Sequence, residues 1–124
     1  MKSILVTDSD ETVCELLKVR LGSRGYAVYT ATDGLTGLKM FEEIRPRLII
    51  TDLMLPAING YQLIRKIKSR EREHGKHDCK IIVLSGRKTE HDIERCFELG
   101  AADYVKKPFS PIELEARIRK QLAE

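Results

Sequence analysis

The chain has 124 residues, a length that suits one compact domain spanning residues 1–124. Hydrophobic residues make up 42% and charged residues 33%, which excludes a disordered chain, and the net charge of +3 is too small to indicate direct nucleic-acid binding. No apolar run approaches the roughly 20 residues that cross a bilayer, and the N-terminus lacks the apolar region of a signal peptide, so we expect a cytoplasmic protein without membrane contact.

Five short apolar runs predict β-strands. In chain order they cover residues 4–6, 27–29, 48–50, 81–84 and 102–105. Several are continuous rather than alternating, which is typical of parallel strands that are covered on both faces.

Amphipathic segments between these runs predict five helices, each with one apolar face toward the core. The faces carry Val13, Leu16, Leu17 and Leu21; Leu35, Leu38, Phe41 and Ile44; Tyr61, Ile64 and Ile67; Ile93, Cys96 and Phe97; and Leu114, Ile118 and Leu122. Gly100 fits a helix end, and Ser110, Pro111 and Glu113 fit a helix start with a capping box. Residues 71–80 form the one long polar loop.

The alternation of strands and helices predicts an α/β fold, a doubly wound (βα)5 unit with a parallel five-stranded sheet and right-handed crossovers. The cysteines, Cys14, Cys79 and Cys96, are odd in number and widely spaced. They therefore predict reduced thiols rather than a disulfide framework, with Cys14 and Cys96 as packing residues.

Ligands of such sheets bind beyond the carboxyl ends of the strands. The polar residues expected there are Asp8, Ser9 and Asp10 after the first strand, Asp52 after the third, Ser85 after the fourth and Lys107 after the fifth. Any one of them alone is an ordinary polar strand end. Together they bring carboxylates, hydroxyls and an ammonium to one edge.

These residue types suit phosphoryl chemistry. Clustered carboxylates need a cation, and Mg²⁺ prefers oxygen ligands. A carboxylate such as Asp52 is a nucleophile toward phosphorus, and the transferred phosphoryl group needs a cation and a hydrogen-bond donor, which Lys107 and Ser85 supply. Lys107 precedes Pro108, a constrained position and a candidate cis peptide bond.

Four segments carry a family resemblance: residues 4–11, 52–60, 81–86 and 100–109. In this order and at these separations they resemble the receiver domain of bacterial response regulators in two-component systems, from end to end of the chain. The resemblance implies a flavodoxin-like sheet with strand order 2-1-3-4-5. It also implies a signalling switch whose only catalysis is self-phosphorylation and autodephosphorylation.

The resemblance implies a role for each matching residue. Asp52 accepts the phosphoryl group from a sensor histidine kinase or phosphotransfer protein, and Asp8, Asp52 and the backbone carbonyl of Met54 bind Mg²⁺. Lys107 pairs with a phosphoryl oxygen, Ser85 moves toward it and Tyr104 changes rotamer. Met54 and Arg87 occupy positions that tune the phosphoryl lifetime. The fourth helix, fifth strand and fifth helix then change shape to bind a downstream target, an output domain or a second copy in a homodimer.

Ser9 departs from the family pattern, in which two adjacent acids follow the first strand. A neutral hydroxyl is a weaker Mg²⁺ ligand than a carboxylate, so we expect reduced affinity. Asp10 either compensates as a ligand or caps the first helix. Asn59 before Gly60 is a milder change that suits a turn.

Three alternatives follow from particular residues. Ser9 favours a pseudo-receiver that binds partners without phosphorylation. Residues 8–12 match a haloacid-dehalogenase-like phosphatase motif, with Asp8 as nucleophile and Asp10 as acid–base, but this leaves the Asp52 motif unexplained. A zinc site at His74, His77 and Cys79 lacks the usual paired spacing and a fourth ligand.

Overall fold

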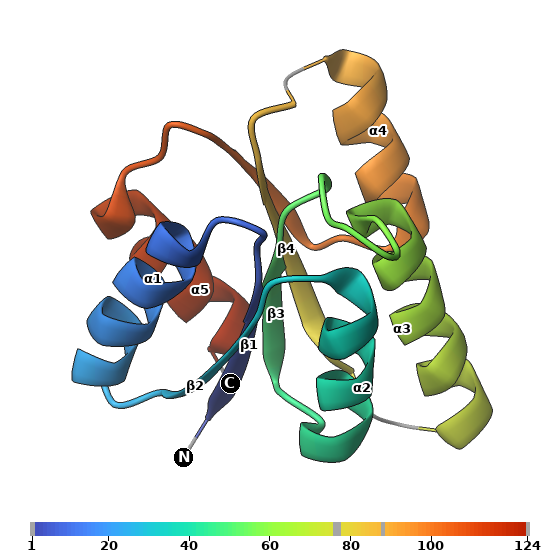
Figure 1. Cartoon of the computed structure of the whole chain (residues 1–124), viewed down its shortest axis with the longest axis horizontal. Helices are drawn as coiled ribbons and strands as arrows, with labels where there is room; N and C mark the ends of the chain where they lie inside the picture. Colours follow the sequence, from blue (N-terminus) through green and yellow to red (C-terminus); the bar gives the residue numbers. More distant parts are fainter. Residues whose placement is uncertain (1, 76–77, 88, 124) are drawn as a thin grey trace.

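The five predicted βα units form in chain order in the computed structural model, which describes residues 2–75, 78–87 and 89–123 (Figure 1). The elements are β1 Ser3–Thr7, α1 Glu11–Ser23, β2 Ala27–Ala31, α2 Gly34–Ile44, β3 Leu48–Thr51, α3 Gly60–His74, β4 Lys80–Ser85, α4 Glu90–Leu99, β5 Asp103–Lys106 and α5 Pro111–Leu122.

The strands form one parallel sheet in the order β2-β1-β3-β4-β5, which confirms the predicted topology. Helices α1 and α5 cover one face, and α2, α3 and α4 cover the other (Figure 1). Neighbouring strand residues point to opposite faces, so Leu5 and Ile49 pack in the core under α2 to α4, whereas Ile4 and Leu48 pack under α1 and α5. This double coverage explains the continuous apolar runs.

Three apolar side chains that we expected in the core are exposed at the surface. The exposed fraction is 40% for Leu16, 55% for Leu35 and 46% for Phe97, so their assignment to the core is wrong. Each helix buries only the stripe that meets the sheet, and these residues lie beside that stripe. Cys14 and Cys96 are buried and unpaired in disulfides, as predicted.

Helix α3 continues into the region that we expected to be a loop. It ends at His74 rather than before residue 71. Glu71 is buried, accepts a hydrogen bond from the backbone N–H of Cys79 at 2.7 Å and lies 3.5 Å from Lys68 Nζ, so the last turns are tied to the start of β4. These contacts stabilise the helical conformation of this polar segment.

The structure describes only two of the three residues of the zinc alternative, His74 and Cys79. Cys79 is fully buried, and the described residues contain no group of three His, Cys, Asp or Glu side chains placed to hold a metal ion. His77, one of the three suggested ligands, lies outside the described residues. None of the helices described is long and apolar enough to span a membrane.

A side-chain cap marks the residue at which each helix begins. The capping residues are Asp10, Asp33, Asn59, Thr89 and Ser110. The capping box that we expected at α5 forms in part. Ser110 accepts from the Glu113 N–H, but the Glu113 carboxylate pairs with Arg117. A complete capping box joins Asn59 and Gln62 instead.

Gly60 lies where α3 begins against the loop that carries Asp52. A Cβ atom at this position would lie 2.3 Å from the carbonyl oxygen of Asp52 and 2.7 Å from Cα of Leu53. Because both are backbone atoms, we expect Gly60→Ala to lower the free energy of unfolding by about 1–3 kcal/mol, measured by chemical denaturation. Gly22→Ala is the control, since open space surrounds Gly22 inside α1 and alanine favours helix there. Equal stability of Gly60→Ala and wild type would contradict the close approach.

Candidate functional site

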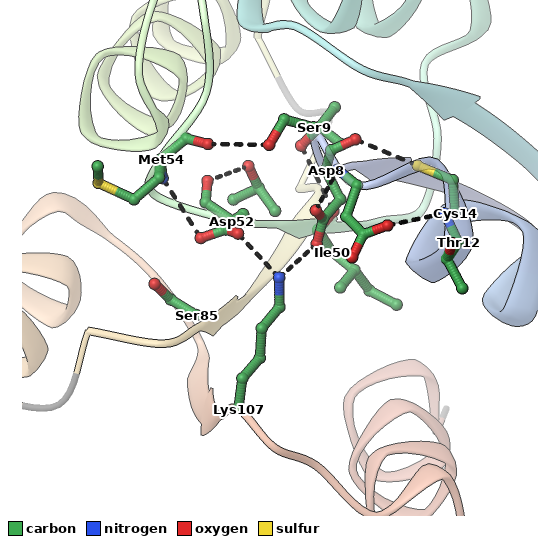
Figure 2. A network of polar contacts seen from close by, with 12 residues as sticks. Asp8, Ser9, Thr12, Cys14, Ile50, Asp52, Met54, Ser85 and Lys107 are labelled. Carbon is green, nitrogen blue, oxygen red and sulfur yellow. Dashed lines mark hydrogen bonds and ion pairs between the residues drawn. The ribbon is translucent and has the colours of Figure 1, made fainter.

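Asp8, Asp52 and Lys107 meet at the carboxyl edge of the sheet (Figure 2). Asp8 and Asp52 directly follow Thr7 and Thr51, which are register partners in β1 and β3, and the Asp52 N–H donates to the Thr7 carbonyl at 2.9 Å. Both acids are buried, with exposed fractions of 2% and 8%. Lys107 Nζ lies 2.8 Å from Asp8 Oδ2 and 2.9 Å from Asp52 Oδ2.

Backbone amides orient both carboxylates. Asp52 Oδ1 accepts from the N–H of Leu53 at 2.6 Å and of Met54 at 3.3 Å, and Asp8 Oδ1 accepts from the Asp10 N–H at 2.9 Å. Each carboxylate therefore has one oxygen held by the backbone and the other held by Lys107. Lys107 is itself held by its N–H bond to the Ser85 carbonyl at 2.8 Å, and its bond to Pro108 is cis.

The site formed by Asp8, Asp52 and Lys107 has more negative than positive groups. Burial raises the pKa of Asp8 above its usual value, although the hydrogen bond from Lys107 acts in the opposite direction. The pKa of Lys107 is also raised, because its hydrogen bonds to Asp8 and Asp52 outweigh the effect of burial. A single ammonium thus faces two carboxylates, so the excess negative charge would favour a further cation.

We expect Asp8→Asn to raise the free energy of unfolding at pH 7 by about 1 kcal/mol, the usual size of a point-mutation effect. A carboxyl whose pKa is higher in the folded than in the unfolded state lowers stability when it is ionised. The gain should therefore be absent below the unfolded pKa of about 3.8 and appear as the pH rises through the folded pKa. Thermal unfolding across this pH range measures it.

Asp10→Ala provides a contrast with the opposite sign. Asp10 is exposed and accepts from the Thr12 N–H at 2.9 Å, so losing this cap should lower stability by about 1 kcal/mol. Destabilisation by Asp8→Asn at pH 7 would show that the bond from Lys107 outweighs the burial of charge.

Oxygen atoms suited to Mg²⁺ line the space beside Asp52. Ser9 Oγ lies 3.5 Å from the carbonyl oxygen of Met54, next to Asp8 and Asp52 (Figure 2). Two carboxylates, a carbonyl and a hydroxyl form a hard donor set that fits this ion. Asp10 caps α1, which is the second of the two roles that we expected for it.

Ser85 and Tyr104 contact the loop between β4 and α4. Ser85 is fully buried, and its Oγ accepts from the Arg87 N–H at 3.2 Å. Within the described part of the chain, no hydrogen bond joins the Ser85 side chain to Asp52 or Lys107, and Figure 2 shows the three side chains around one space. The Tyr104 hydroxyl donates to the Arg87 carbonyl at 2.5 Å. Arg87 thus touches both residues of the expected switch.

Sequence reasoning missed the residues that hold Arg87. Asp92 in α4 accepts from Arg87 Nε at 3.3 Å, from the Tyr61 hydroxyl at 2.6 Å and from Thr89 Oγ1 at 2.5 Å. Hydrogen bonds from Thr89 and then Tyr61 lower the pKa of Asp92 to about 2. The spacing of Thr89 and Asp92 is a helix-start signal, but nothing local points to Tyr61 in another helix.

Comparisons with known proteins agree with this geometry. The sequence model of one protein family, the response regulator receiver domain, matches residues 4–119. The probable transcriptional regulator ycf27 of Galdieria sulphuraria is 41% identical over 118 residues, covering 95% of this chain and 44% of that protein. The alkaline phosphatase synthesis transcriptional regulatory protein PhoP of Bacillus subtilis is 39% identical over 118 residues, covering 95% and 47%.

A solved structure supports the same assignment. The non-phosphorylated HemR receiver domain of Leptospira biflexa has a TM-score of 0.90 at 29% identity, covering 100% of this chain and 96% of that one. This chain spans about half the length of the curated relatives that it matches. The family match covers nearly all of the chain, and the fold and the strand order agree with it. The chain therefore belongs to the response regulator receiver domain family of two-component signalling.

Proposed function

We propose that the domain is a phospho-acceptor switch in which Asp52 receives the phosphoryl group. The observation that carries this proposal is the position of Asp52, buried at the sheet edge with one carboxylate oxygen on Lys107 and the other on backbone amides. The donor is a phosphohistidine of a sensor histidine kinase or phosphotransfer protein in the cytoplasm. The family assignment supports this class of donor.

Asp8, Asp52 and the Met54 carbonyl would hold Mg²⁺, with the Ser9 hydroxyl as a weaker fourth group. The ion would offset the charge that gathers on the phosphoryl oxygens. Asp10 is a poorer candidate, because its carboxylate already caps α1.

In the transfer, an Asp52 carboxylate oxygen forms the new O–P bond while the P–N bond to the histidine breaks. The imidazole leaves with the electron pair of that bond. Lys107 stabilises the negative oxygens of the transferred group, and Ser85 donates a hydrogen bond once it turns toward them. Water later attacks the phosphorus atom, the O–P bond to Asp52 breaks, and inorganic phosphate leaves, which restores the carboxylate. The exposed side chains of Met54 and Arg87 influence the rate of this step.

The response travels from Ser85 and Tyr104 to the outer face of α4, β5 and α5. Phosphorylation adds about −1.5 to −2 charges and new acceptor oxygens. When Ser85 moves, Tyr104 and the Arg87 carbonyl lose their present arrangement, so the face that they border changes shape. This face would bind a protein target, an output domain or a second copy of the domain.

A pseudo-receiver is the second candidate, and Ser9 is the observation that favours it. The hydroxyl replaces a charged ligand, and Lys107 already neutralises part of the charge on Asp8 and Asp52. In this case the domain would bind partners without being phosphorylated.

Incubation with acetyl phosphate distinguishes the two candidates. We expect intact-mass spectrometry to show an adduct of about 80 Da, one phosphoryl group, that requires Mg²⁺ and disappears with a chelator. Absence of the adduct at every Mg²⁺ concentration would favour the pseudo-receiver.

A further inference from the structure

Asp92 connects three segments that surround the proposed switch. Its carboxylate is buried, with an exposed fraction of 6%. It accepts hydrogen bonds from Tyr61 in α3, Arg87 in the loop after β4 and Thr89 at the start of α4. Arg95 of α4 adds a second link to α3, because its guanidinium lies 4.0 Å from the centre of the Tyr61 ring. Within the described ranges, no hydrogen bond or ion pair joins Asp92 to Asp52 or Lys107.

Arg87 carries this restraint to the switch residues. Its N–H donates to Ser85 Oγ, its carbonyl accepts from Tyr104, and its guanidinium lies between Asp92 and the Met54 sulfur, 3.4 Å away. Met54, Tyr61 and Arg87 also line a surface pocket of about 430 Å³. The Arg87 side chain thus borders open space beside its contacts with Asp92 and Met54.

We propose that Asp92 is a positioning residue that holds Arg87 and Thr89, between β4 and α4, in the conformation of the unphosphorylated domain and so opposes the switch. Ser85 Oγ accepts from the Arg87 N–H, so a rotation of the Ser85 side chain that carries Oγ toward the phosphoryl group breaks this bond. That bond depends on the loop conformation that Asp92 and Tyr61 maintain. Weakening the hold therefore lowers the cost of the switched state and raises its population.

The first measurement is amide hydrogen exchange of the peptide spanning the loop from Ser85 to Glu90, in the unmodified domain. We expect Asp92→Asn to speed exchange by at least about tenfold, because it removes the charged acceptor of Arg87 and Tyr61. Tyr61→Phe removes one hydroxyl only, keeps the fold and should speed exchange by about threefold.

Glu115→Gln is the matched control. Glu115 is also a buried acid, with an exposed fraction of 5%, and it pairs with Arg20 at 2.7 Å and Arg24 at 2.9 Å. It lies on α5 and faces α1, so loss of its charge should leave exchange in the loop unchanged.

The second measurement rests on the proposed function. It is the affinity for beryllofluoride, a phosphoryl mimic, titrated at saturating Mg²⁺ and followed by amide NMR signals. We expect both variants to bind it more tightly than wild type, by the same factors as in exchange, and Glu115→Gln to match wild type.

The outcomes separate the two proposals. If wild type binds no beryllofluoride while Asp92→Asn still speeds loop exchange, the phosphoryl switch is wrong and the holding role of Asp92 is supported. If Asp92→Asn and Tyr61→Phe exchange like Glu115→Gln, the holding role is wrong. Faster exchange without tighter binding, in a wild type that does bind, also contradicts it, because the loop would then not oppose the switch.

Discussion

Asp52→Asn is expected to abolish the Mg²⁺-dependent phosphoryl adduct completely. The amide has no second carboxylate oxygen to form the O–P bond, and it loses the charge that attracts a cation. The fold should persist, because the remaining amide oxygen still accepts from the N–H groups of Leu53 and Met54. The measurement is intact mass after incubation with acetyl phosphate and Mg²⁺, with thermal unfolding as the check on folding.

Asp33→Asn is the control for this experiment. Asp33 also follows a strand at the carboxyl edge, but it is only half-buried and caps α2 by accepting from the Thr36 N–H at 2.7 Å. Asparagine is an equally good cap, so this variant should be phosphorylated like wild type. An undiminished adduct in Asp52→Asn would mean that another side chain is the acceptor.

Ser9→Asp is expected to tighten Mg²⁺ binding by at least about tenfold, which corresponds to about 1.4 kcal/mol. The new carboxylate would replace the Ser9 hydroxyl, which lies 3.5 Å from the Met54 carbonyl oxygen, and it would add a full negative charge to the donor set. Without Mg²⁺ the same charge lies close to Asp8 and Asp52, so this variant should unfold at a lower temperature than wild type. Titration calorimetry and thermal unfolding with increasing Mg²⁺ measure both effects.

Ser9→Asn separates charge from size. The amide is close to aspartate in shape and neutral, so it should leave Mg²⁺ affinity near the wild-type value. If Ser9→Asp binds Mg²⁺ no better than Ser9→Asn, the side chain at this position does not reach the ion, and the expected weakness of the site has another cause.

The sequence alone determined the fold and the edge at which polar residues gather. Continuous apolar runs predict strands covered on both faces, and the carboxyl ends of parallel strands necessarily lie together. Asp8, Asp52 and Lys107 were therefore predicted neighbours, and the ion pairs from Lys107 to both acids join them. The roles of these residues in phosphoryl transfer stay predictions.

Only the tertiary structure decided which apolar residues are buried and what holds the switch loop. Periodicity marks one side of a helix, but the neighbouring elements decide how wide a stripe they cover, so Leu35 and Phe97 remained outside the core. For Asp10 the sequence allowed two roles, a Mg²⁺ ligand or a helix cap, and the structure shows that it caps α1. The contact of Asp92 with Tyr61 joins residues 31 positions apart on different helices. No local pattern encodes such a pair, because its distance depends on how two helices pack on the same sheet.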